Sequence, residues 1–255
     1  MKKTPLSVVL ITRDAGHLLT DCLESVAFAD EIVIVDSGSR DNTMAIAQEY
    51  RARTMFQPWL GYGPQKQFAV SQATHDWVLC LDADERVSPE LRESILKTLG
   101  NPVFKAYRFP RRNRFLGRWL AHGEGYPDLS LRLFHRHHAA WSDDPIHEKV
   151  QTREAIGQLR GDLLHESEQT LTDYIAKQNL YTTLQAQRIH QSGQRIAPYR
   201  IVFSPLVRFI RFYVFRLGFL DGLPGLIHIA IGAFNSFLKY AKVTAKHLDG
   251  DNPKD

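Results

Sequence analysis

The sequence predicts an α/β fold built on a mostly parallel, Rossmann-like central sheet. Short, continuously apolar runs alternate with helical patterns through residues 1–100, as in strands that are covered on both faces. The repeated β-α-β order favours a parallel sheet with right-handed crossovers. Polar and acidic residues follow each run, at the edge where a parallel sheet binds its ligands.

The strands and helices of this first part follow in order. The runs SVVLIT (7–12), EIVIVD (31–36) and WVLCLD (77–82) are the expected strands. Apolar residues at helical spacing predict a helix within 15–28, and Asp41 is the expected N-cap of the next helix.

The second part of the chain has a different pattern. Residues 104–165 read as short strands rich in aromatic and basic residues. A helix is predicted next, because Thr170 with Asp173 three residues later is a start signal and Gly193 is a stop signal. We therefore expect one domain over 1–195, with halves 1–100 and 101–195, and a helical region over 196–255.

Composition fits one large domain or one domain with an appendage. The chain has 255 residues, 44% hydrophobic and 24% charged, which excludes disordered, collagen-like and polytopic membrane proteins. Residues 199–255 carry eight Lys and Arg against four Asp and Glu, so the net charge of +4 belongs to this tail. Cys22 and Cys80 stand at apolar positions and read as core residues.

The tail mixes aliphatic and aromatic residues with arginine and lysine. A spanning helix needs roughly 20 largely apolar residues, and the best candidate, 217–238, contains Asp221, Pro224 and four glycines. Helices that lie in a membrane interface suit this mixture better; a hairpin packed on the domain or in a dimer is the alternative. The N-terminus lacks a signal-peptide cleavage site, which favours a cytoplasmic location.

The third run leads directly into Asp82, Asp84 and Glu85. Burying carboxylates costs several kcal/mol unless something pairs with them, and a hard divalent cation that bridges a diphosphate would satisfy them. Acids at strand ends are often helix caps, however, and Ser88 or Glu85 is an alternative start for the following helix. The position of this D-x-D after an apolar strand favours a metal site.

Asp36 ends the second run and is followed by SGSRDNT. An acid at this depth commonly accepts hydrogen bonds from a ribose or a base. An Asx-turn with Ser37 and Gly38 is the structural alternative, and both interpretations are compatible.

These motifs together carry a family resemblance. SVVLITRD, EIVIVDSGSRDNT and GYGPQKQFAVSQATHDWVLCLDADE resemble the nucleotide-sugar half of family 2 inverting glycosyltransferases with the GT-A fold. YPDLSLRLFHR, IHEKV and LLHESEQTLTDYIAKQNLYT are similar to bacterial lipopolysaccharide-core β-glucosyltransferases, which transfer glucose to a core heptose. The resemblance covers most of residues 5–190 and is looser in the tail.

The resemblance implies a UDP-sugar donor and Mg²⁺ or Mn²⁺ as cofactor. Asp84 would bind the cation directly, and Asp82 would lie nearer the ribose or sugar. Lys66 would touch the donor, with an ordinary solvated lysine as the alternative. The residues implied to hold uracil and ribose are Thr12, Asp14 and Asp36.

Two further positions are compared with the wider family. His165 follows the apolar segment GDLLH and is a candidate metal ligand, since several enzymes of this fold recruit a late histidine. Arg13 stands where the wider family often has asparagine or glutamate, so its role stays open.

Inverting transfer requires a base on the acceptor hydroxyl, because a single displacement enters from the face opposite the leaving diphosphate. Glu148 in DPIHEKV is the first choice and Asp128 in GYPDLSL the second. The alternative for Glu148 is a salt bridge with a neighbour such as Lys149 or Arg132.

Basic and aromatic residues interleave over 105–119. This pattern suits nucleic acid, an anionic glycolipid or a solvated strand edge. No nucleic-acid fold signature is present, so we favour the glycolipid and expect no nucleic-acid partner. The residues expected to meet the acceptor are Arg111, Arg112, Arg132 and His147.

The sequence thus predicts a metal-dependent inverting hexosyltransferase. It would move a hexose, with glucose favoured, from a UDP-sugar to a lipopolysaccharide inner-core sugar such as heptose, as a peripheral protein on the cytoplasmic face of the inner membrane. The alternatives are a polyprenyl-phosphate glycosyltransferase, whose acceptor needs no base, and a catalytically silent membrane-docking scaffold. A nucleotidylyltransferase is disfavoured because a glycine-rich phosphate loop is absent near the N-terminus.

Overall fold

The computed structural model describes residues 4–144, 148–166, 170–194 and 196–251. The chain forms two compact units: the first is Met1–Arg112 with Asp128–Glu166, and the second is Asn113–Pro127 with Ser167–Asp255. The sequence predicts a domain boundary after residue 195 instead. The division differs because helix α5 (Leu171–Gln191), expected in the acceptor half, packs against the C-terminal helix α7.

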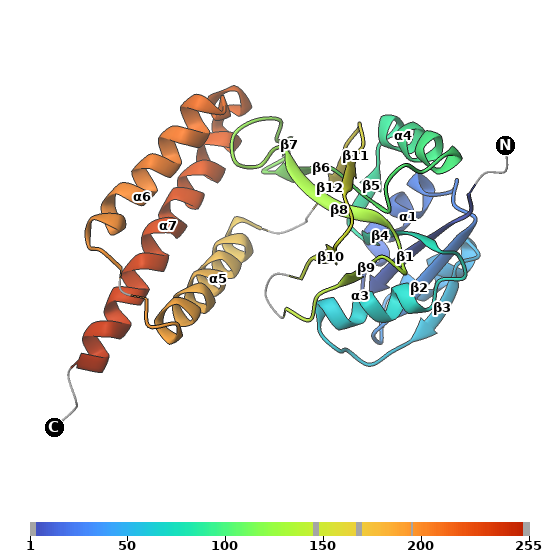
Figure 1. Ribbon diagram of the computed structural model, residues 1–255, viewed down its shortest axis with the longest axis horizontal. Helices are drawn as coiled ribbons and strands as arrows, with labels where there is room; N and C mark the ends of the chain where they lie inside the picture. The colour runs from blue at the N-terminus through green and yellow to red at the C-terminus, as the bar shows by residue number, and fades with distance from the viewer. Residues whose placement is uncertain (1–3, 145–147, 167–169, 195, 252–255) are drawn as a thin grey trace. The chain divides into compact units, whose positions relative to one another are not determined.

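The first unit is an α/β domain around a mixed sheet with strand order β3-β2-β1-β4-β8-β6-β12-β5 (Figure 1). The strands β1 to β4 are parallel, whereas β8 is antiparallel to both β4 and β6. A separate pair is formed by β9 and β10. The strands are β1 (Leu6–Thr12), β2 (Glu31–Asp36), β3 (Arg53–Phe56), β4 (Trp77–Asp82), β5 (Glu85–Val87), β6 (Ala106–Phe115), β8 (Asp128–His135), β9 (Ala139–Trp141), β10 (Val150–Thr152), β11 (Ile156–Gln158) and β12 (Leu163–His165).

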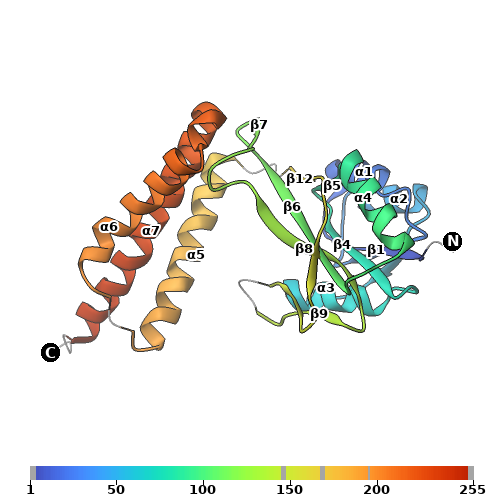
Figure 2. The same cartoon turned by 45° about the horizontal axis from the view of Figure 1, so that its top comes forward.

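Helices cover both faces of the parallel half. Figure 2 shows α1 (Gly16–Ser25), α2 (Thr43–Glu49) and α4 (Pro89–Gly100) on one face and α3 (Tyr62–Ser71) on the other. Successive side chains of a strand point to opposite faces, so β1 contributes to two cores. Val8 and Leu10 join the core under α1, and Val9 joins the core under α3. The predicted α/β class is confirmed, with a parallel half-sheet that helices cover on both faces.

Local signals set the ends of two helices near the sheet edge. Ser88 is the N-cap of α4, because its Oγ accepts the N–H of Leu91 at 3.3 Å and Pro89 follows. The acids of the D-x-D are therefore not the helix cap. Asp41 accepts the N–H groups of Thr43 (3.0 Å) and Gly16 (2.8 Å), so it joins the starts of α1 and α2, with Asn42 at the N-cap position.

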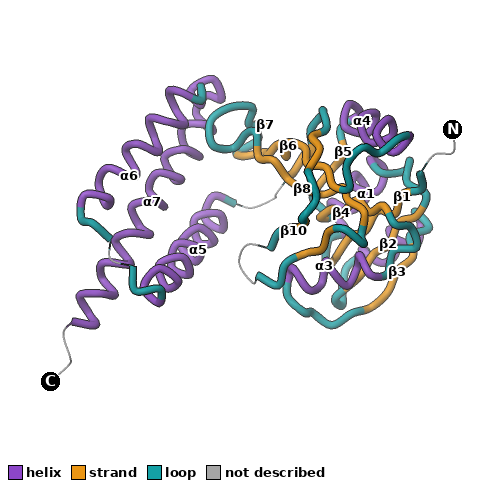
Figure 3. Tube along the Cα trace, viewed as in Figure 1, coloured by secondary structure: helices purple, strands orange, loops and turns teal. Residues whose placement is uncertain are grey.

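The second unit is mainly helical. Its longest helix, α7 (Gly222–Asp251), packs against both α5 and α6 (Tyr199–Ile210) (Figure 3). A π-helical turn (Arg211–Phe215) and a 3₁₀ turn (Gly218–Asp221) join α6 to α7. The short strand β7 (Arg118–Trp119) pairs with the end of β6.

In the part of the chain that the structure describes, no single helix has the length and hydropathy of a membrane span. The bent pair Tyr199–Phe215 and Gly218–Leu248, with 74° between its members, meets those criteria when the two are taken together.

Candidate active site

The carboxyl ends of β1, β2 and β4 place their polar residues at one edge of the sheet. Thr12 lies opposite Asp36, and Ile11 lies opposite Asp82. Thr12 Oγ1 donates to Asp36 Oδ1 at 2.9 Å. The register of the parallel strands thus brings together residues from three separate sequence runs, as expected at the ligand edge of such a sheet.

Asp36 organises the loop that follows β2. Its Oδ2 accepts the N–H groups of Gly38 and Ser39, both at 2.8 Å, so the Asx-type turn is present. Burial alone raises the pKa of Asp36, but hydrogen bonds from Ser39, Gly38 and Thr12 outweigh it and lower this pKa below its ordinary value.

Asp14 is exposed and joins the same loop. Its N–H donates to Ser39 Oγ at 2.8 Å, and its Oδ1 accepts the N–H of Arg40 at 2.7 Å. Asp14 has φ +49°, a left-handed conformation that aspartate tolerates better than most residues. The three residues assigned to uracil and ribose therefore share one hydrogen-bonded loop.

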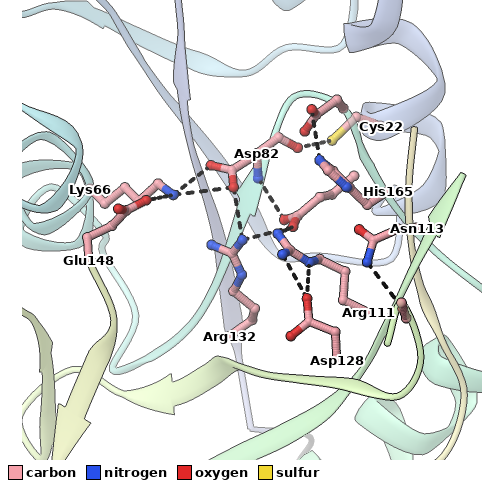
Figure 4. A network of polar contacts seen from close by, with 12 residues as sticks. Cys22, Lys66, Asp82, Arg111, Asn113, Asp128, Arg132, Glu148 and His165 are labelled. Atoms are coloured by element: carbon pink, nitrogen blue, oxygen red, sulfur yellow. Dashed lines mark hydrogen bonds and ion pairs between the residues drawn. The ribbon is translucent and has the colours of Figure 1, made fainter. Parts of the chain in front are cut away.

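Protein cations neutralise Asp82, which Figure 4 shows between Lys66 and Arg132. Arg132 also neutralises Glu85. Asp82 pairs with Lys66 Nζ at 3.0 Å and with Arg132 Nη2 at 2.9 Å. Glu85 is fully buried, and it accepts from Arg132 Nη2 at 2.8 Å and from the N–H of Asp82 at 3.0 Å. The expectation that a divalent cation must satisfy these acids is therefore wrong for Asp82 and Glu85, because the protein supplies the countercharge.

The charges in this cluster reinforce one another. Burial alone raises the pKa of Asp82, but Lys66 and Arg132 hold it well below its usual range. Burial lowers the pKa of Arg132, but Glu85 and Asp82 raise it above its ordinary value. Asp82 and Arg132 are therefore both ionised at neutral pH.

Arg132 and Lys66 share an aromatic neighbour that sequence reasoning missed. The guanidinium carbon of Arg132 lies 5.4 Å from the ring centroid of Trp141, and Lys66 Nζ lies 4.8 Å from it. Arg132 Nη1 is buried and has no hydrogen-bond partner among the described residues. Trp141 lies in a three-residue strand, and its short apolar context gave no signal of this role.

Asp84, the second acid of the D-x-D, has a different partner. Its Oδ2 lies 3.1 Å from His165 Nε2. The antiparallel pairing of β12 with β5 places His165 opposite Glu85, which explains how a residue 81 positions away reaches the motif. The two proposed metal ligands are therefore adjacent, although no group of three His, Cys, Asp or Glu side chains suited to a metal occurs among the described residues.

Lys66 connects the acidic cluster to Glu148. Its Nζ lies 3.3 Å from Glu148 Oε1, and the lysine is only 7% exposed, so the alternative of a solvated lysine is wrong. Glu148 does form an ion pair, but its partner is Lys66 and not Lys149 or Arg132. A Cβ at Gly63 would lie 2.0 Å from the carbonyl oxygen of Ser142, so only glycine permits this approach of α3.

The remaining acceptor candidates lie on the other half of the sheet. Asp128, the second candidate base, pairs with Arg111 Nη2 at 2.7 Å (Figure 4). Arg111 also lies 3.6 Å from Glu85, and Arg112 lies 3.7 Å from Asp162. His147 lies outside the described residues.

Comparison with known proteins gives the family. The profile of the family described as "Glycosyl transferase family 2" matches residues 7–154, more than half of the chain and a range that includes Lys66, the D-x-D and Glu148. The chain belongs to glycosyl transferase family 2. The family 2 resemblance found in the sequence is thereby confirmed, and the chain is a glycosyltransferase family enzyme.

Individual known proteins are similar along most of the chain. "Lipopolysaccharide core biosynthesis glycosyltransferase LpsC" of Rhizobium meliloti (strain 1021) is 36% identical, with 96% of this chain and 94% of the relative covered. An uncharacterised glycosyltransferase of Rickettsia typhi (strain ATCC VR-144 / Wilmington) is 29% identical, with 99% and 90% covered. Among solved structures, S. aureus TarS 1–349 in complex with UDP-GlcNAc gives a TM-score of 0.48 at 14% identity, with 96% and 92% covered.

Proposed function

We propose that this family 2 enzyme transfers a hexose, with glucose favoured, from a UDP-sugar to an inner-core sugar of lipopolysaccharide such as heptose, with inversion. Support for the acceptor class comes from the relative named for lipopolysaccharide core biosynthesis, which is similar over nearly the whole chain.

The donor would occupy the carboxyl edge of β1, β2 and β4. Thr12, Asp14 and Asp36 share one hydrogen-bonded loop there and would hold the uracil and ribose. Asp82 and Lys66 stand beside them at 3.0 Å from each other and would face the ribose, sugar and diphosphate. A lysine near the diphosphate stabilises the negative charge that develops as UDP departs.

The observation that carries the proposal is the Asp82–Lys66–Glu148 chain of contacts. It places the Glu148 carboxylate, whose side chain is 21% exposed, on the same lysine that contacts Asp82. In the proposed step the acceptor oxygen attacks the anomeric carbon and the bond from that carbon to the diphosphate breaks. Glu148 takes the hydroxyl proton, and UDP leaves from the opposite face, which inverts the configuration.

The residues at Asp84 fit a divalent cation. A carboxylate oxygen and an imidazole nitrogen 3.1 Å apart are a donor pair that suits Mn²⁺, and Mg²⁺ through the carboxylate. Asp84 and His165 would hold the ion. When bound, such an ion would neutralise charge on the diphosphate.

Acceptor recognition would fall to the basic residues beyond the cluster. Arg111, Arg112 and Arg132 are proposed to meet the anionic core sugar, together with His147. Arg132 has one unpartnered, buried nitrogen among the described atoms, which suits an additional hydrogen bond to a bound ligand. We propose that the enzyme works at the cytoplasmic face of the inner membrane and contacts the membrane through its C-terminal region.

The decisive experiment incubates the enzyme with Mn²⁺, a panel of UDP-sugars and truncated core glycolipid, and weighs the products. Glu148→Gln should lower transfer by about 10²- to 10⁴-fold while UDP binding, measured by calorimetry, stays within about twofold. Asp128→Asn is the matched control and should retain far more activity.

Three results would contradict the proposal. Transfer to a polyprenyl phosphate that survives Glu148→Gln would favour a reaction without a base. Failure to bind UDP in the presence of Mn²⁺ would favour a silent scaffold. A product that retains the donor's anomeric configuration would exclude single displacement.

A further inference from the structure

Helix α6 presents a continuous apolar face to solvent. The α6 apolar face consists of Val202, Phe203, Leu206, Val207 and Ile210, which are each between 39% and 65% exposed. Their spacing of three or four residues places them on one side of the helix. Every residue of α6 is described, and none is buried.

The opposite side of the same helix holds it within its unit. Arg208, on that side, donates from Nε to Glu124 Oε2 at 3.2 Å. Helix α6 also packs along α7. The α6 apolar face is therefore an additional surface that the fold of this unit does not use.

Charge lies next to this face. Arg200 and Arg211 are both exposed and are eleven residues apart, which is about three turns of an α-helix, so they share one side. On a helical projection that side adjoins Phe203 and Val207. The 3₁₀ turn after the helix carries another exposed apolar side chain, Phe219, which is 46% exposed. Soluble monomers rarely expose an apolar patch of this length without a partner for it.

We infer that the α6 apolar face docks on a bilayer surface that contains anionic phospholipids. The helix would lie in the plane of the interface, with its apolar side chains at the acyl boundary and Arg200 and Arg211 at the lipid phosphates. A second copy of the chain fits less well, because a symmetric contact through this face brings the same arginines together. The inference specifies the membrane contact of the proposed function, but it requires only this helix and no transfer activity.

Flotation of the full-length protein with vesicles tests the inference. The protein should float with vesicles of phosphatidylcholine and phosphatidylglycerol and much less with phosphatidylcholine alone. The double variant Phe203→Ser/Leu206→Ser should lower binding by about tenfold or more, since it removes two side chains that would be buried in the interface. Arg200→Gln/Arg211→Gln should lower binding to the vesicles that contain phosphatidylglycerol, by about fivefold for each arginine. The same variant should leave binding to pure phosphatidylcholine vesicles unchanged.

The matched control is Phe56→Ser/Val103→Ser, which removes two apolar side chains of similar exposure (68% and 78%) from the first unit. It should float like the unchanged protein. Equal binding by the Phe203→Ser/Leu206→Ser variant, or no binding by the unchanged protein, would overturn the inference. So would a dimer in gel filtration that this variant converts to a monomer without any vesicle binding. UDP binding reports separately on the transferase proposal.

Discussion

Asp82 and Asp84 are two positions apart, yet their carboxylates have different surroundings. Asp82 is held by Lys66 and Arg132, whereas Asp84 faces His165. The first acid is a fixed part of an ion-pair network, and the second is the one suited to a metal. The D-x-D motif thus combines a positioning acid with a candidate ligand.

Replacing each acid by asparagine should separate these roles. Asp82→Asn should lower the free energy of unfolding by about 2–4 kcal/mol, because it leaves two largely buried cations short of a partner. Asp84→Asn should lower it by about 1 kcal/mol or less and abolish Mn²⁺ binding. Chemical denaturation measures the free energy of unfolding, and calorimetry measures Mn²⁺ binding. If Asp84→Asn lowered the free energy of unfolding more than Asp82→Asn does, the assignment of Asp82 to the ion-pair network and Asp84 to the metal would be contradicted.

At this scale the sequence predicts the acids better than their partners. Asp36, Asp82 and Asp84 stand at strand ends, where position alone indicates a ligand edge. The contact of Glu148 with Lys66 joins residues 82 positions apart and depends on how α3 meets the loop before β10. No local pattern encodes such a contact, and the position of Trp141 beside both cations was likewise not foreseen.

Strand β2 begins with Glu31, at the edge of the sheet opposite the candidate active site. This acid stabilises the pairing of the parallel strands. Glu31 accepts hydrogen bonds from Ser7 Oγ (2.5 Å), from the N–H of Thr74 (2.8 Å) and from Arg53 Nη2 (3.0 Å). Burial alone raises the pKa of Glu31, but these hydrogen bonds lower it from 4.5 to about 2. The ionised carboxylate therefore joins β1, β2 and β3.

This shift predicts a pH-dependent contribution to stability. A carboxylate whose pKa is lower in the folded state than in the unfolded state contributes its full stabilisation above the unfolded-state pKa. This contribution is lost as pH falls through the folded-state pKa. Glu31→Gln should therefore lower the free energy of unfolding by about 2 kcal/mol at neutral pH. The difference in this free energy between the variant and the unchanged protein should shrink as pH falls from about 4.5 to about 2. Urea unfolding across this range measures it. The exposed Glu49→Gln is the control, and a difference that grows as pH falls would refute the prediction.

Strands with strong apolar runs are the elements that sequence predicts well. The runs 31–36 and 77–82 coincide with β2 and β4, and 7–12 differs from β1 by one residue. Strand β3, whose residues are partly exposed at the sheet edge, carries no such run and was not foreseen. The insertion of antiparallel β8 beside β4 was not foreseen either, because pairing order is a tertiary property.

At the scale of the whole molecule, the segment Asn113–Pro127 belongs with the C-terminal helices. Asp221, 2% exposed, accepts the N–H groups of Ala121 (3.0 Å) and His122 (2.8 Å) and lies 3.2 Å from His122 Nδ1. One buried carboxylate therefore attaches this segment to the turn before α7. A single domain boundary in the sequence cannot reveal that Asn113–Pro127 belongs with the C-terminal helices, because residues 128–166 of the first unit lie between them in the chain.

Asp221→Ala should destabilise the second unit selectively. The variant leaves two N–H groups without their acceptor, which costs about 2–4 kcal/mol. Hydrogen exchange should accelerate in peptides from 113–127 and 222–248 and remain slow in β1, β2 and β4. The exposed Lys177→Ala, also in the second unit, serves as control. Uniform acceleration across both units, or unchanged exchange in 113–127, would show that Asp221 does not have this role.

The path of the chain also bears on how chimeric enzymes can be made. Because Asn113–Pro127 lies in the second unit, a chimera that joins the tail of one homologue to the body of another at residue 167 would pair a foreign helical bundle with a native loop. Buried Asp221 would then meet a segment that did not evolve beside it. Exchange of both segments together, with splice points at 113, 128 and 167, keeps every contact of that unit within one parent.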